Sequence, residues 1–105
     1  MPAKFRVEIT RTAETDADGI RRFIARDDPD AADRFVGELE RQVETLERLP
    51  ERCPLIPENA LLRTAYRHLL FRDYRTIFRL SGRTVLVLRI VHGTQLLDSS
   101  MFAVR

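Results

Sequence analysis

The chain has 105 residues, of which 44% are hydrophobic and 32% charged, and its formal net charge is +2. This length fits a single domain over residues 1–105, and the composition is that of a folded protein, which excludes a disordered chain. No apolar run approaches the ~20 residues that a membrane span needs, so we expect no membrane partner. A single cysteine leaves no internal disulfide, and the N-terminal residues lack the apolar region of a secretion signal. We therefore expect a protein of the reducing cytoplasm.

Charge is unevenly distributed along the chain. Residues 1–59 hold 10 Lys and Arg against 14 Asp and Glu, a balance of −4, whereas residues 60–105 hold 8 Arg against 2 Asp, a balance of +6. A basic half of this kind favours a nucleic acid or an acidic protein as the partner, and charge alone does not separate the two.

The first half of the chain predicts one strand followed by two helices. The strand covers residues 5–10, where apolar and polar residues alternate. An amphipathic helix follows from residue 12 to about residue 26. Its expected core face consists of Ala13, Ala17, Ile20, Phe23 and Ile24. A second helix is predicted over residues 29–49, where apolar residues recur at three- and four-residue steps after a capping Asp28.

The second half predicts a loop and three strands. Residues 50–62 contain three prolines and are expected to form the loop. The strands are predicted at about 65–71, 74–80 and 84–92, with Gly82 allowing a tight turn between the last two. The last strand is nearly continuous in aliphatic residues, so we expect it at the centre of the sheet.

This order, β-α-α-β-β-β, constrains the topology. The last three strands form an antiparallel meander, and the first strand can join only the free edge of the central strand. A right-handed crossover through both helices makes these two strands parallel. We predict an α+β fold with a mostly antiparallel four-stranded sheet and a helical hairpin on one face. The other face is expected to be open and shallow and to present many of the arginines.

The segment "YRHLLFRDYRTIFRLSGRTVLVLRIVHG", residues 66–93, resembles the RelE/ParE superfamily of toxins from type II toxin–antitoxin systems. The resemblance rests on the Tyr66-Arg67 pair, on "YRTIFRL" and on "VLRIVHG", which is similar to a signature of ParE-like members. With the element order, it covers nearly the whole chain. It implies a cognate antitoxin with an acidic, partly disordered segment that orders on binding, and a possible higher-order toxin–antitoxin hetero-oligomer.

The superfamily contains two activities on one scaffold. RelE-like members cleave mRNA on the ribosome, and Arg75 matches a strand arginine of these enzymes. ParE-like members inhibit DNA gyrase and are not nucleases. RelE-like enzymes carry a basic residue after the last strand and a C-terminal tyrosine, where this chain has Gly-Thr-Gln at 93–95 and Phe102. We therefore expect a gyrase or topoisomerase inhibitor rather than an enzyme. A ribosome-dependent mRNA endonuclease is one alternative, and a non-toxic binding module on the same fold is another.

The basic segment and the resemblance to the toxin superfamily together indicate candidate site residues. The residues expected to bind the antitoxin or the target are Arg63, Arg67, Arg72, Arg75 and Arg79. For a nuclease, the catalytic candidates are Arg75, Arg89 and His92. His68 lacks companion ligands at metal-binding spacing, so neither a metal nor another cofactor is expected.

Two of these residues have alternative roles. His92 can act as an acid or base near neutral pH, or it can end its strand, hydrogen-bond the backbone and fix the turn at Gly93. Arg89 lies in the most apolar strand and therefore needs a partner such as Asp73, Asp98 or a carbonyl group. A structural ion pair and a contact with a ligand both satisfy that need.

Overall fold

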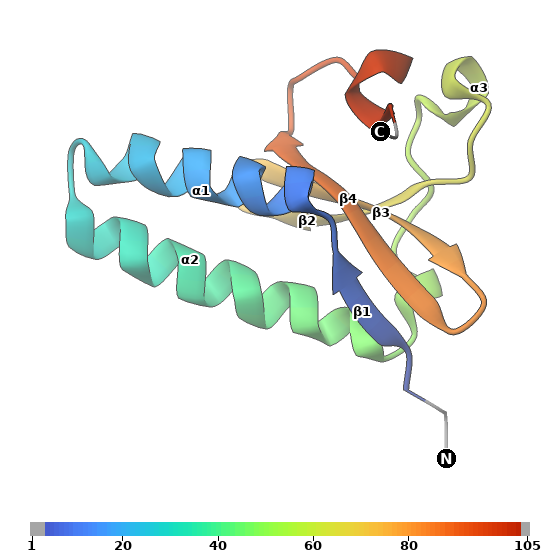
Figure 1. Cartoon of the computed structure of the whole chain (residues 1–105), viewed down its shortest axis with the longest axis horizontal. Helices are drawn as coiled ribbons and strands as arrows, with labels where there is room; N and C mark the ends of the chain where they lie inside the picture. Colours follow the sequence, from blue (N-terminus) through green and yellow to red (C-terminus); the bar gives the residue numbers. More distant parts are fainter. Residues whose placement is uncertain (1–3, 104–105) are drawn as a thin grey trace.

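The computed structural model describes residues 4–103 (Figure 1) and has the predicted α+β architecture. Its strands are β1 (Arg6–Ile9), β2 (Arg67–Phe71), β3 (Tyr74–Ser81) and β4 (Thr84–His92). Its α-helices are α1 (Arg11–Ala25), α2 (Pro29–Glu44) and α3 (Asn59–Leu62), and its 3₁₀ helices are η1 (Thr45–Glu47), η2 (Pro50–Arg52) and η3 (Ser99–Phe102). Within residues 4–103, no helix combines the length and the apolar character needed to span a membrane.

The sheet has the order β1-β4-β3-β2, which confirms the predicted topology. β1 runs parallel to β4, with Arg6 opposite Thr84, and the other two pairs are antiparallel. Gly82 turns the chain between β3 and β4 with a φ of +58°, a backbone conformation that glycine adopts without a steric penalty. The mostly aliphatic β4 is central because it has strands on both edges and residues of the core on both faces.

The two long helices begin at side-chain caps. Thr10 accepts a hydrogen bond from the backbone N–H of Ala13, and Asp28 accepts one from that of Ala31, both at 3.1 Å. The helix predicted over residues 29–49 ends earlier, at Glu44, and continues as η1. The last predicted turn is not helical, because Leu49 adopts a φ of +47° immediately before a proline.

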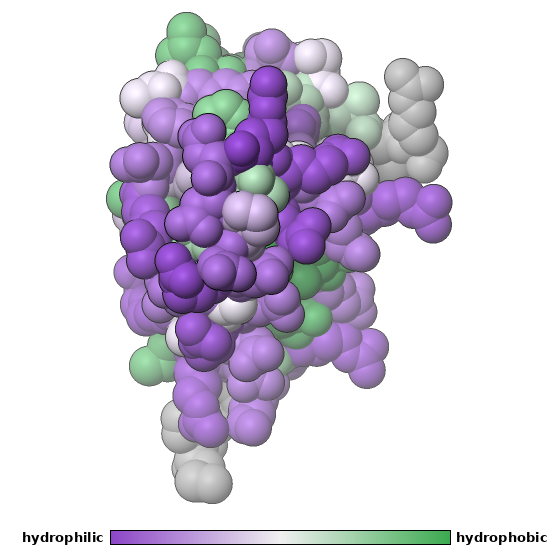
Figure 2. Space-filling view, turned by 90° about the vertical axis from the view of Figure 1, so that its left-hand side faces the viewer, coloured by the Kyte–Doolittle hydropathy of each residue, from purple (hydrophilic) through white to green (hydrophobic). Residues whose placement is uncertain are grey.

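The main core lies between the helical hairpin and one face of the sheet. Phe78 is fully buried there, and Phe35 from α2 packs on Phe71 and Tyr74 with ring centroids 5.5 and 5.4 Å away. Phe23 was expected on this core face, but it is 66% exposed. The cause is its position near the end of α1, where the hairpin extends past the sheet. Figure 2 shows that this end is covered mainly by hydrophilic residues, with small hydrophobic spots.

A second, smaller core covers part of the opposite sheet face. Its buried members are Ile56, Ile77, Val91 and Leu97. Tyr66 and Phe102 extend it with ring centroids 5.0 Å apart. The expectation of an open, shallow face is therefore wrong for this part of the sheet. The chain between α2 and β2 and the segment after β4 carry enough apolar side chains to bury it, and α3 and η3 of these two segments lie near each other above the sheet in Figure 1.

Candidate functional site

The five arginines expected to bind a partner are in different environments. Arg63 and Arg79 are exposed, and no ion pair engages either of them within residues 4–103. Arg67 donates to the backbone carbonyls of Cys53 and Glu51, at 2.6 and 3.1 Å. Some of the five arginines are thus used for contacts inside the fold, whereas Arg63 and Arg79 are exposed.

Arg72 lies in the β2–β3 turn with a φ of +53° and pairs with Glu38 of α2 at 2.8 Å. Its hydrogen bond lowers the pKa of the Glu38 carboxyl. The Arg72 guanidinium also lies 5.5 Å from the ring centroid of Phe71. The pair joins the turn to the helical hairpin across an exposed surface, where such contacts contribute little to stability.

Arg75 is almost completely buried on the sheet face opposite the hairpin. Its side chain is 7% exposed and forms a two-pronged ion pair with Glu58, with N–O distances of 3.0 and 3.4 Å. Its Nε atom is buried without a hydrogen-bond partner among the described residues. Burial of a guanidinium is tolerated here because a carboxylate of opposite charge accompanies it.

A pocket of about 380 Å³ lies beside Arg75, and we call it the Arg75 pocket. It lies where the ends of β2, β3 and β4 meet, and its polar lining includes His68, Asp73, Arg75, His92 and Thr94. The Nδ1 atom of His68 is also buried without a partner in the described part of the chain. Burial is the main cause that lowers the pKa of His68, and the positive charge of Arg75 lowers it further.

This lowered pKa predicts a pH dependence of stability. The unfolded chain has a His68 pKa near 6.5, above the folded value, so the unfolded state binds more protons between the two values. The contribution of neutral His68 is complete above pH 6.5 and is lost as the pH falls through 6.5 toward the folded pKa. Urea unfolding should therefore show the stability of the wild type falling relative to His68→Gln between about pH 8 and about pH 5.5. Parallel pH curves for the two proteins would contradict the prediction, and Arg79→Gln serves as the control for an exposed change in the same hairpin.

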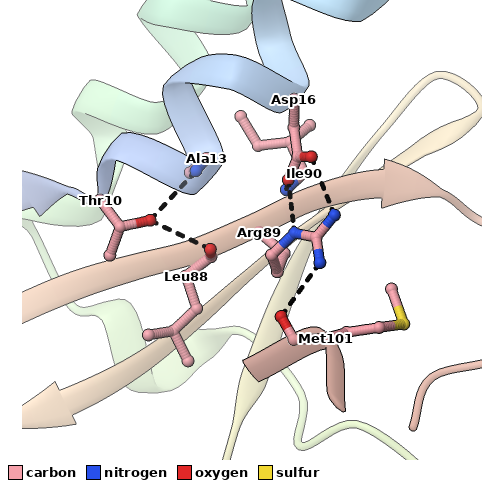
Figure 3. Close-up of polar contacts among 7 residues, drawn as sticks. All are labelled: Thr10, Ala13, Asp16, Leu88, Arg89, Ile90 and Met101. Carbon is pink, nitrogen blue, oxygen red and sulfur yellow. Dashed lines mark hydrogen bonds and ion pairs between the residues drawn. The ribbon is translucent and has the colours of Figure 1, made fainter. Parts of the chain in front are cut away.

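Arg89 binds Asp16 through two hydrogen bonds, of 2.7 Å from Nε and 2.9 Å from Nη2 (Figure 3). Its third nitrogen donates to the backbone carbonyl of Met101 at 3.0 Å. The hydrogen bonds to Asp16 raise the pKa of the Arg89 guanidinium. Of the two roles considered for Arg89, the structure has the ion pair, and the carboxylate comes from α1 rather than from either acid suggested by the sequence.

β1 pairs with β4 only as far as Val87. Beyond that point, Asp16 hydrogen-bonds the backbone of β4 in place of a neighbouring strand. Its carboxylate accepts a hydrogen bond from the backbone N–H of Ile90 at 2.9 Å, and the hydroxyl of Thr10 donates to the carbonyl of Leu88 at 3.1 Å (Figure 3). Sequence reasoning missed Asp16. A signal was present, because Asp16 is three residues after Ala13 and therefore lies on the core face of α1.

His92 ends β4 and bonds to its own turn. Its Nδ1 accepts a hydrogen bond from the backbone N–H of Thr94 at 3.2 Å and lies 2.8 Å from the Thr94 hydroxyl. The turn is tight, because a side chain at Gly93 would lie 3.3 Å from the carbonyl oxygen of Asp73. These contacts agree with the structural role considered for His92.

The three nuclease candidates are thus only partly brought together. Arg75 and His92 line the Arg75 pocket, whereas Arg89 is bonded to Asp16 and Met101 and lines a different hollow, which it shares with His92 but not with Arg75. Within residues 4–103, no group of three or more His, Cys, Asp and Glu side chains is arranged to hold a metal ion.

A second hollow, of about 710 Å³, lies between β1, α1 and α2, and we call it the β1 groove. Its floor is apolar and includes Phe5, Val7, Ala17, Val36, Leu39 and Val43. Five acidic side chains line its rim, namely Glu14, Asp18, Glu40, Glu44 and Glu47. The rim also has Arg6 and Arg21, which pair with Glu8 and Asp33. The groove is therefore apolar inside and predominantly acidic outside, which the overall positive charge of the chain does not reveal.

The chain is similar to known toxins in both sequence and fold. The family model described as the ParE toxin of the type II toxin–antitoxin system parDE matches residues 7–97. The chromosomal ParDE toxin–antitoxin system from P. aeruginosa contains a similar structure, with a TM-score of 0.67 and 24% identity over 85% of this chain and 96% of that one. The toxin–antitoxin complex RelBE2 from Mycobacterium tuberculosis contains another, with a TM-score of 0.60 and 23% identity over 86% and 99%. No curated protein has a significant match to the chain.

Proposed function

Because the chain belongs to the ParE toxin family and is therefore the toxin of a type II toxin–antitoxin system, we propose that it inhibits DNA gyrase or a related topoisomerase by binding, without cleaving nucleic acid. It would act in the cytoplasm and be neutralised by a cognate antitoxin. The observation that carries the absence of cleavage is the pairing of Arg75 and Arg89 with carboxylates of the same chain. An arginine must offer its N–H groups to a phosphate in order to stabilise the charge that develops during cleavage.

A ribosome-dependent mRNA endonuclease remains the second candidate. One observation favours it, since Arg75 and His92 line the same pocket and supply the residue types that phosphate binding and proton transfer require. A non-toxic binding module on this fold is the third candidate. It retains the surface that binds the antitoxin but has no effect on growth.

Controlled expression separates these three candidates. We expect arrested growth, a DNA-damage response and inhibited supercoiling by gyrase, while mRNA stays intact. Rapid cleavage of mRNA on ribosomes would overturn the proposal in favour of the nuclease, and Arg75→Ala should then abolish that cleavage. Normal growth of cells that express the chain and lack the antitoxin gene would favour the binding module.

We further propose that the β1 groove receives a segment of the antitoxin. β1 is an edge strand: one of its edges pairs with β4, and within residues 4–103 no strand pairs with the other edge, where the N–H of Phe5 just before β1 bonds to the Glu47 carbonyl at 2.8 Å. The backbone N–H of Arg6 bonds to the Arg83 carbonyl and that of Thr10 to the Val87 carbonyl, so the alternate residues Val7 and Ile9 turn their backbone groups away from β4. An extended chain can pair with this edge while its side chains enter the apolar groove.

The charge of the rim determines which antitoxin residues fit. The acids of the rim have no ion-pair partners among residues 4–103, while both of its arginines have one. The segment in the groove should therefore alternate apolar residues with Lys or Arg. Acidic residues of the antitoxin would instead meet exposed arginines elsewhere, such as Arg63 and Arg79.

A further inference from the structure

The Arg75 pocket contains polar atoms that no other group of the described chain satisfies. Arg75 is 5% exposed and its Nε is buried without a partner, as is Nδ1 of His68. Buried polar atoms are nearly always paired, so two such atoms beside one pocket indicate a site suited to a polar guest. The pocket volume of about 380 Å³ is ample for a small oxyanion with water.

Glu58 neutralises the positive charge of Arg75. Its carboxylate holds both terminal nitrogens of the guanidinium and is itself 15% exposed, so the pair is shielded from solvent. In this two-pronged geometry a carboxylate uses the same N–H groups that a phosphate would use. An anion entering the pocket would meet a guanidinium that is already neutralised.

The backbone around Glu58 is anchored rather than loosely placed. The side chain of the next residue, Asn59, donates to the Tyr66 carbonyl at 2.9 Å and accepts from the Tyr66 N–H at 3.0 Å and from the Thr64 hydroxyl at 2.7 Å. The N–H of Ile56 bonds to the same Tyr66 carbonyl at 3.0 Å. These contacts attach the segment that carries Glu58 to the start of β2, so the carboxylate is held over Arg75.

The neighbouring charges do not offset the effect of Glu58. Arg72 also lines the pocket but is paired with Glu38, and Asp73 adds a negative charge. Burial, and after it Arg75, lower the pKa of His68 and favour its neutral form, and they outweigh the opposite effect of the Glu58 carboxylate. With Glu58 present, both guanidinium groups of the pocket lining are therefore paired with carboxylates, and without Glu58 the buried Arg75 would be unpaired.

We propose that Glu58 is a specificity-determining residue that keeps the Arg75 pocket closed to phosphate groups by holding Arg75 in an internal ion pair. Removal of its charge opens a phosphate-binding site formed by Arg75 with His68 and Thr94. The proposal concerns this pocket alone. The phosphate measurement does not depend on the cellular target of the toxin. A supercoiling assay that shows no inhibition would therefore leave it unchanged.

The test is a titration of the full-length Glu58→Gln variant with inorganic phosphate at constant ionic strength, with chloride as the replacement salt. Glutamine retains one acceptor oxygen and the side-chain length, so it removes the charge with the least change of shape. Backbone amide NMR signals of β3 and β4 near the pocket should shift on phosphate addition, with an affinity about tenfold or more above that of the wild type. The double variant Glu58→Gln/Arg75→Gln should lose this gain.

The matched control is Asp33→Asn, which removes the carboxylate of the exposed pair with Arg21, changes the net charge equally and lies outside the lining of the Arg75 pocket. The proposal is overturned if Glu58→Gln binds phosphate no better than this control, or if the double variant still shows the gain. If Glu58→Gln is unfolded in chloride, phosphate must restore its circular dichroism, since the anion replaces the lost carboxylate. Failure of phosphate to restore the fold would also overturn the proposal.

Discussion

Replacing Arg89 with alanine is expected to lower the free energy of unfolding by about 3–5 kcal/mol, because it leaves a buried carboxylate without its counter-charge. The side chains of Arg89 and Asp16 are 19% and 15% exposed, so water replaces little of the lost interaction. The change also removes the hydrogen bond to the Met101 carbonyl. Most domains have a total stability of about 5–15 kcal/mol, so urea unfolding should show a large loss. The rate of amide hydrogen exchange should rise in η3, because the hydrogen bond from Arg89 to the Met101 carbonyl holds η3 to the sheet.

The control is Arg72→Ala, which breaks the exposed pair with Glu38. Those side chains are 59% and 35% exposed, and the expected loss is a small part of that expected for Arg89→Ala. The double variant Asp16→Ala/Arg89→Ala should cost less than the sum of its two single changes, since each change alone strands a charge. Equal losses for Arg89→Ala and Arg72→Ala would show that the buried pair has no special role.

The Ala17→Arg variant is expected to weaken antitoxin binding about 100-fold or more, which corresponds to roughly 2.8 kcal/mol. Ala17 lies on the floor of the β1 groove, and a long side chain there occupies the space that the antitoxin segment needs. Its positive charge would also repel the basic residues expected in that segment. The affinity for the cognate antitoxin can be measured by calorimetry with purified components.

The matched control for this variant is Thr15→Arg, an exposed position of the same helix that does not line the groove. It should bind the antitoxin as the wild type does. In cells, Ala17→Arg should remain toxic when the antitoxin is co-expressed, whereas Thr15→Arg should be neutralised. Equal binding by both variants would place the antitoxin on another surface.

The positions of the strands followed closely from the sequence, because their patterns are local. The strand predicted at 84–92 has those bounds in β4, and its continuous aliphatic character predicted the central position that the sheet order confirms. The parallel pairing of β1 and β4 followed from the handedness of the crossover. The resemblance of residues 66–93 to the RelE/ParE superfamily led to the family that the match over residues 7–97 shows.

The environments of the arginines did not follow from the sequence. The basic character of residues 60–105 suggested an exposed surface, yet Arg75 is buried beside Glu58, on the sheet face that the second core partly covers. The charge count could not reveal this, because apolar residues of the chain before β2 and after β4 cover the sheet face. The acidic rim of the β1 groove was missed for a related reason. Its acids come from α1, α2 and η1, and only the fold brings them around one groove.

The element order, the α+β class and the toxin family followed from the amino-acid sequence, because they depend on short-range periodicity, turn residues and motifs of adjacent residues. The sheet topology followed as well, from the handedness of the crossover. Which charges are free to bind a partner is set instead by the fold. Arg89 and its carboxylate Asp16 are 73 positions apart, and Arg75 and Glu58 are 17 positions apart. Such pairs form only when the crossover and the loop bring distant segments together, so the choice among many possible acidic partners is made by packing.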